Sequence, residues 1–95
     1  MSNIRRLVLD TLKPHEPGII EMSKAISDLD GITAVNISIY EIDRKVENAK
    51  ITIEGDDISY QSVLSIITEM GATVHSIDEV VAGRKIIEDA STPQD

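Results

Sequence analysis

The stretch from Ile32 to Glu54, ITAVNISIYEIDRKVENAKITIE, decides the fold. Apolar and polar residues alternate in it twice, from Ile32 to Asp43 and again from Val46 to Glu54. An alternation of period two is typical of strands with one buried and one exposed face. Because the two alternating segments flank Arg44-Lys45, the sequence predicts a β-hairpin that turns at these two residues.

Helical and strand patterns flank this hairpin on both sides. The predicted elements are a strand from Ile4 to Leu12, a helix from Pro17 to about Gly31, a helix that Asp57 or Ser59 caps and Gly71 ends, and a strand from Thr73 to about Ala82. The order β-α-β-β-α-β consists of two halves with right-handed crossovers. The sequence therefore predicts a ferredoxin-like α+β sandwich, with an antiparallel sheet in the order 4-1-3-2 and both helices on one face.

The composition limits the class of partner. Seventeen acids against nine bases give a net charge of -8, which repels phosphate backbones and anionic membranes. We therefore expect no nucleic-acid partner and no membrane partner. The chain has no cysteine for a disulfide or a thiolate metal site, and neither a signal peptide nor a run of ~20 apolar residues is visible. A cytoplasmic protein is expected.

The end of the chain carries more apolar residues than one small domain needs. Residues 1–89 are predicted to form one domain with an extension from about residue 83, and residues 90–95 are predicted to be a disordered tail. Ile86 and Ile87 lie in the extension, beyond the last core strand. A chain of 95 residues buries a smaller share of its surface on folding than a longer chain does. We therefore expect a homo-oligomer in which these isoleucines contact a neighbouring chain.

Three carboxylates are predicted to meet at one end of the sheet. In the order 4-1-3-2, the carboxyl ends of the first two strands lie beside the amino ends of the last two, so Asp10, Glu41 and Asp43 should gather there. His75 begins the last strand at the same end. Carboxylate groups of this kind bind hard cations, so calcium or magnesium is the expected metal. The alternative is that these acids are solvated strand ends, since no EF-hand spacing is present.

A second candidate site is the loop before the first helix, where His15, Glu16 and Gly18 lie beside two prolines. Free amide groups at a helix N-terminus can bind the carboxylate of a small ligand. With His75, these residues form the predicted ligand-binding set, and two histidines also suit zinc or general-base chemistry. The alternative is structural use, because no His-x₃-His spacing marks a zinc site and Glu16 can cap the helix.

Other polar residues have structural alternatives, and several familiar uses of this fold require residues that the chain lacks. Asp78 and Glu79 in the last strand are open to structural use, such as an ion pair with Arg6. The chain lacks the Cys-x-x-Cys of soft-metal carriers, the strand aromatics of RNA-recognition modules and the first-loop arginine of acylphosphatases. No nucleophile with an adjacent base, phosphate loop or cofactor motif is visible, so an enzyme is not expected.

Four motifs resemble a known family. They are Leu12-Lys-Pro-His-Glu-Pro17, Glu41-Ile-Asp43 with Glu47-Asn48, Ile51-Thr-Ile-Glu-Gly55 and His75-Ser-Ile-Asp-Glu-Val-Val-Ala-Gly83. On these motifs the chain resembles an archaeal family of small ferredoxin-like proteins, the domain-of-unknown-function family two-hundred-eleven. The resemblance implies the fold, a cytoplasmic archaeal setting and homo-oligomers, closed rings among them. It implies no catalytic residues.

A second resemblance supplies an alternative function. Glu16-Pro-Gly-Ile-Ile and Leu29-Asp-Gly-Ile are similar to segments of ACT-type regulatory domains, which bind amino acids at subunit interfaces. Two functions therefore stay open. One is a non-enzymatic oligomeric binding or scaffold module that takes a hard divalent cation. The other is an ACT-like regulatory domain that binds an amino acid or another small ligand.

Overall fold

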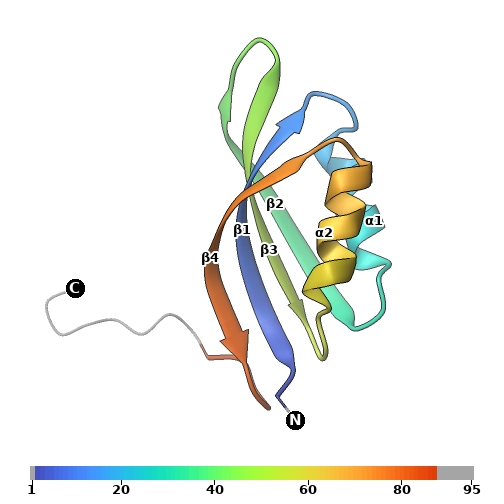
Figure 1. Cartoon of the computed structure of the whole chain (residues 1–95), viewed down its shortest axis with the longest axis vertical. Helices are drawn as coiled ribbons and strands as arrows, with labels where there is room; N and C mark the ends of the chain where they lie inside the picture. Colours follow the sequence, from blue (N-terminus) through green and yellow to red (C-terminus); the bar gives the residue numbers. More distant parts are fainter. Residues whose placement is uncertain (1, 88–95) are drawn as a thin grey trace, which may run out of the picture.

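A computed structural model describes residues 2–87 of the chain. One four-stranded sheet carries both helices on the same side (Figure 1). The elements are β1 (Ile4–Pro14), α1 (Ile19–Ser27), β2 (Ile32–Ile42), β3 (Val46–Gly55), α2 (Tyr60–Glu69) and β4 (Thr73–Ala82). The predicted tail at 90–95 and the end of the predicted domain at 88–89 lie outside the described residues.

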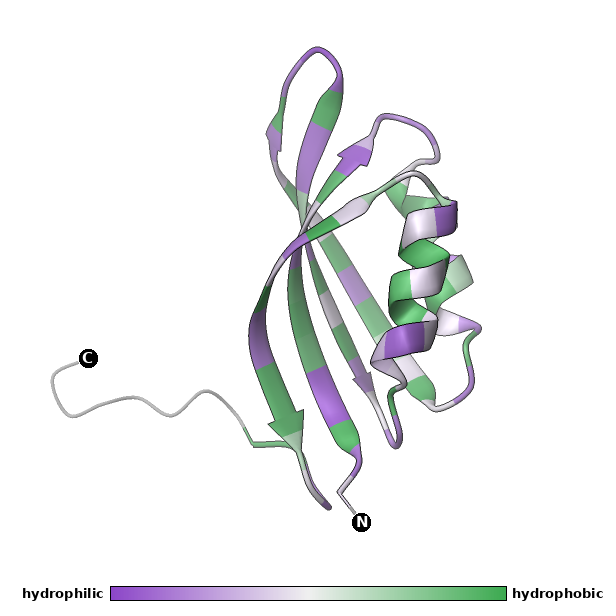
Figure 2. Cartoon of the chain, in the orientation of Figure 1, coloured by the Kyte–Doolittle hydropathy of each residue, from purple (hydrophilic) through white to green (hydrophobic). Residues whose placement is uncertain are grey.

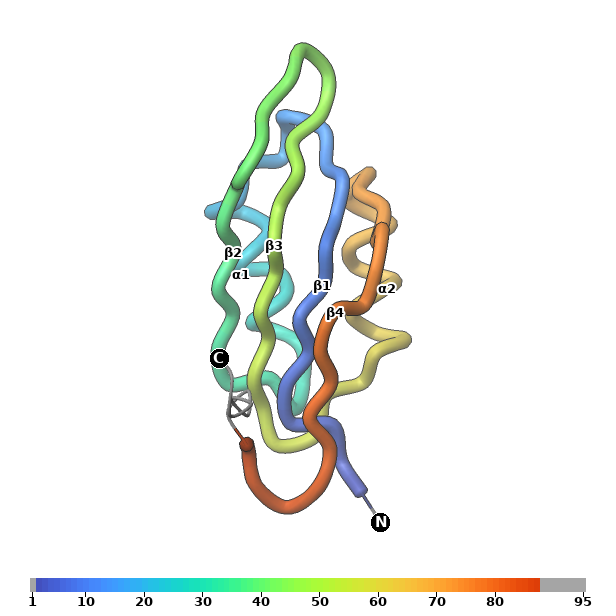
Figure 3. Tube along the Cα trace, turned by 90° about the vertical axis from the view of Figure 1, so that its left-hand side faces the viewer, coloured from blue at the N-terminus to red at the C-terminus, as the bar shows by residue number. Residues whose placement is uncertain are grey.

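The sheet has the order β2-β3-β1-β4, and every neighbouring pair is antiparallel. Figure 3 shows the four strands side by side, with the helices behind them. This arrangement confirms the predicted ferredoxin-like α+β fold. The sheet face away from the helices is called the open face here, and β2 and β4 are the two edge strands.

The core lies between the sheet and the helices. β1 and β3 contribute buried side chains at alternate residues, β2 and β4 contribute partly buried ones, and each helix contributes an apolar stripe. Its buried members are Leu7, Leu9, Met22, Ile26, Ile51, Ile53, Ile58, Val63, Ile67 and Ala72. The members are almost entirely aliphatic, as a chain without Phe or Trp requires.

The ends of the elements differ slightly from the prediction. β1 continues two residues past Leu12 to Pro14, because its backbone still pairs with β3 there. Ser59, rather than Asp57, caps α2, and its hydroxyl accepts a hydrogen bond from the N–H of Ser62 at 3.2 Å. Gly71 ends the same helix with a φ of 84°, which glycine adopts most readily.

The two helices are short, at nine and ten residues. Within residues 2–87, neither has the length and apolar character that crossing a bilayer requires.

Candidate functional site

The β2–β3 turn at one end of the sheet is largely hydrophilic (Figure 2). We call this end the hairpin end, and it consists of residues 42–47 and the adjacent 13–16 of the β1–α1 connection. Lys13 lies at its centre with a fully buried side chain. Its ammonium group is 2.9 Å from Glu47 Oε1 and donates to the carbonyl oxygen of Pro14 at 2.7 Å. These partners compensate for the loss of water around the charge.

His15 extends this network to the turn. One ring nitrogen, Nδ1, is 2.9 Å from Glu47 Oε2, and the other, Nε2, is 3.0 Å from the carbonyl oxygen of Arg44. Both partners are acceptors, so only the doubly protonated imidazolium donates to both. The hydrogen bond to Glu47 raises the pKa of His15, and the same bond lowers the pKa of Glu47. His15 therefore connects the β1–α1 loop to the hairpin, and these contacts support a structural use of His15.

The acids predicted to bind a metal have separate partners. The Asp43 carboxylate accepts the N–H groups of Val46 and Lys45 at 3.0 and 2.9 Å, which lowers its pKa. Asp10 accepts the hydroxyl of Tyr40, and this bond raises the pKa of Tyr40. Glu41 lies opposite Asn48 in the hairpin.

Within residues 2–87, no three His, Cys, Asp or Glu side chains converge in a way that could hold a metal ion. The register of the sheet separates the three predicted ligands, since Asp10 pairs with Lys50 of β3, Glu41 pairs with Asn48, and Asp43 follows the end of β2. Calcium or magnesium binding by Asp10, Glu41 and Asp43 therefore stays a prediction, which titration can test.

The surroundings of Gly18 differ from those of the other predicted ligand-binding residues. Gly18 is the N-cap residue of α1, where no side chain caps the first amide groups and open space surrounds its Cα. Glu16 and His75 are both exposed, and His75 lies on the edge strand β4. Only Gly18 and the loop before it keep the geometry that a small anionic ligand would use.

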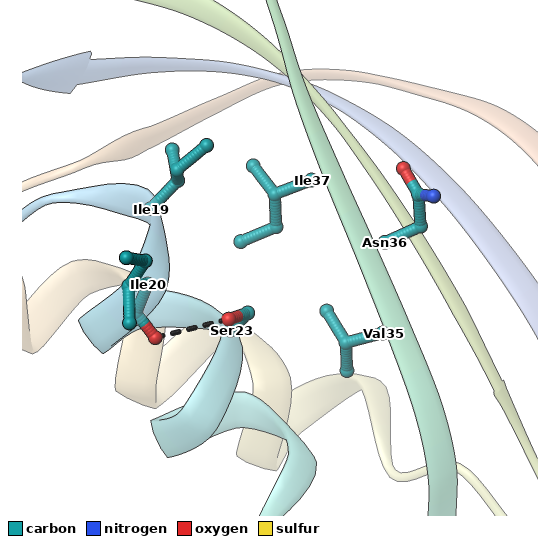
Figure 4. A pocket seen from close by; sticks show the side chains of 6 residues that line it. All are labelled: Ile19, Ile20, Ser23, Val35, Asn36 and Ile37. Carbon is teal, nitrogen blue, oxygen red and sulfur yellow. Dashed lines mark hydrogen bonds between the residues drawn. The ribbon is translucent and has the colours of Figure 1, made fainter.

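A groove lies between α1 and the edge strand β2. It has a volume of about 250 Å³ and is lined by Ile19, Ile20, Ser23, Val35, Asn36 and Ile37 (Figure 4). The Ser23 hydroxyl donates to the carbonyl oxygen of Ile20 at 3.0 Å. The lining combines four aliphatic side chains with the polar groups of Ser23 and Asn36. Ile20 is 70% exposed.

Sequence reasoning missed the roles of Lys13, Glu47 and Tyr40. The period of β1 holds a signal for Lys13, because it follows Leu7, Leu9 and Thr11 at intervals of two. The predicted ion pair of Glu79 with Arg6 is confirmed at 3.3 Å. Glu54 is a further partner of the same guanidinium, at 2.6 Å.

Comparison with known proteins identifies the family of the chain. The model of the family DUF211, described as "Uncharacterized ArCR", matches residues 5–95. The chain belongs to this family. It is also similar to the "Uncharacterized protein MJ0319" of Methanocaldococcus jannaschii, with 55% identity over 95 residues that cover all of this chain and 98% of that protein. The resemblance seen in the four sequence motifs is thereby confirmed.

Proposed function

We propose that this chain is a non-enzymatic binding or scaffold module that works as a homo-oligomer in the cytoplasm, with calcium or magnesium as a candidate ligand. One observation supports assembly above the others, namely the number of large aliphatic side chains that are exposed outside the core. These residues are Ile20, Ile42, Ile77, Val80, Ile86 and Ile87. They are numerous relative to the small aliphatic core, and a second copy of the chain could bury them.

The shape of the sheet supports the same proposal. Both edge strands are long, at 11 and 10 residues, and each has a strand neighbour on one side only within residues 2–87. Long edges present N–H and C=O groups that another chain can pair with. The polar open face, in contrast, offers no comparable apolar area.

Measurement of the native mass by light scattering tests the proposal. Wild type should be larger than one chain, and Ile86→Asp with Ile87→Asp should yield smaller species, because two charges would enter the contact. Ser62→Asp with Ser65→Asp adds the same charge at exposed positions of α2 and serves as the control. A wild-type mass of 10.4 kDa, that of a single chain, would remove homo-oligomerisation from the proposal.

The ACT-like alternative is supported by the start of α1. Gly18 leaves the first amides of the helix without a side-chain cap, and these amides attract carboxylates. A thermal-shift screen of the common amino acids and nucleotides should then contain a stabilising compound. A ligand at 100 times its dissociation constant adds about 2.7 kcal/mol to the free energy of unfolding. A screen without a shift would count against this alternative.

A further inference from the structure

The two edges of the sheet are protected to different degrees. β4 shifts register against β1 at three places and carries Asp78 and Glu79, and bulges and charges of this kind discourage pairing with another strand. β2 shifts register near its two ends only. Between those shifts, residues 34–39 are uncharged and pair regularly with β3. β2 is therefore the edge that is open to an added strand.

The open edge lies beside the groove of α1. The groove residues Val35 and Ile37 come from this regular stretch of β2, and Ile20 faces them from the helix (Figure 4). A segment added beside β2 would gain backbone hydrogen bonds from the edge, and alternate side chains of it would point toward the aliphatic side chains of the groove.

Two isoleucines follow the last strand in the segment Arg84-Lys85-Ile86-Ile87. Ile86 is 39% exposed and Ile87 is 63% exposed. The Arg5 guanidinium donates to the carbonyl oxygens of Gly83 at 2.9 Å and Arg84 at 2.6 Å. Arg5 therefore holds the start of this segment against β1.

The segment of one chain leaves the fold on the side away from its own groove. The groove lies on the helix-covered side of the sheet, whereas the segment leaves on the side of the open face (Figure 1). A second copy of the chain is the occupant that fits.

We propose that residues 84–87 of one copy dock as an added strand against β2 of another copy, with an isoleucine in the groove beside Ile20. Neighbouring residues of a strand point to opposite sides, so only one of the two isoleucines enters. Ile87 is the more exposed on its own chain and is assigned to the groove. This docking presupposes the homo-oligomer proposed above. It is heterologous, since the surface that each copy gives differs from the surface that it receives.

Two variants and their mixture test the docking. Ile20→Glu places a charge in the groove, and Ile86→Asp with Ile87→Asp places two charges in the docking segment. Either change should raise the dissociation constant of the assembly at least about 30-fold, as the loss of an interface hot spot does. Ile20→Lys should have the same effect as Ile20→Glu, because either charge would be buried. Thr73→Asp, at an exposed position of the protected edge, is the control and should leave the mass unchanged.

The mixture distinguishes this docking from other contacts. An equimolar mixture of the groove variant and the segment variant has one intact pairing, between the segment of the former and the groove of the latter. It should therefore form pairs, although each variant alone is monomeric. If wild type assembles but the mixture stays monomeric, or if Ile20→Glu keeps the wild-type mass, the docking is wrong and the homo-oligomer stands. A monomeric wild type would contradict both.

Discussion

The helix-covered centre of the sheet and its hairpin end are built from opposite kinds of contact. The centre is an aliphatic layer with residues such as Ile53 and Ile67, which no water reaches. The hairpin end instead places the buried ammonium of Lys13 between a carboxylate and backbone carbonyls. Hydrophobic burial is non-directional and roughly proportional to area, whereas a buried charge depends on each partner. The two regions should therefore respond to different perturbations.

The largest effect is expected in the centre. Ile67→Ala would leave a cavity at a fully buried position and should lower the free energy of unfolding by roughly 2–5 kcal/mol. Gln61→Ala, at an exposed position of the same helix, should change it by less than about 0.5 kcal/mol. Urea denaturation of the two variants measures the difference. Similar midpoints would mean that α2 does not carry the core.

A smaller effect is expected at the hairpin end. Glu47→Gln removes the negative charge between Lys13 and His15, so that only neutral acceptors surround the ammonium group of Lys13. The melting temperature should fall, because a buried ammonium without its counter-charge is costly. Glu69→Gln, an exposed acid at the end of α2, is the matched control. Equal melting temperatures for the two variants would show that Lys13 needs no carboxylate.

The hairpin end should also make stability depend on pH. His15 has a raised pKa, so its contribution is complete below its ordinary value of 6.5 and is lost as the pH rises through the raised value. Glu47 has a lowered pKa, so its contribution is complete above 4.5 and is lost as the pH falls through the lowered value. The pKa of Asp43 is lowered as well, so the contribution of Asp43 is also lost as the pH falls. The network should therefore stabilise most between pH 4.5 and 6.5.

Melting curves from pH 4 to pH 9 check this dependence. His15→Gln should lower the melting temperature most near pH 6, and its difference from wild type should shrink in alkaline buffer. His75→Gln is the control, because no hydrogen bond or ion pair engages His75 within residues 2–87. A difference that stays constant over the whole range would assign His15 a packing role only.

The smallest effect is expected from a hard cation. Asp10, Glu41 and Asp43 do not converge within residues 2–87, so calcium uptake should require millimolar concentrations and shift melting only slightly. Asp43→Asn should reduce that shift further, because an amide gives less charge to the ion. Calorimetric titration without heat and melting without a shift would remove calcium and magnesium from the proposed function.

The same contrast explains what the sequence could predict. The period of two in β2 and β3 and the period of 3.6 in the helices follow from burial on one side, so the fold and most element ends were predictable. The network of Lys13, His15 and Glu47 was not, because it joins residues up to 34 positions apart and no period marks such partners. The bonds of Asp43 to the N–H groups of the tight turn were not predictable either, because they depend on local geometry that composition does not contain.

The backbone contact between the two ends of the sheet has a topological consequence. The N–H of Gly83 donates to the carbonyl oxygen of Asn3 at 2.9 Å, so the chain returns to its starting point after one circuit of the fold. A short linker from Gly83 to Asn3 would close the backbone into a ring, and new ends could be opened at Arg44-Lys45. Such a circular permutant would keep every strand pairing of the native sheet while moving both termini to the opposite end of the domain.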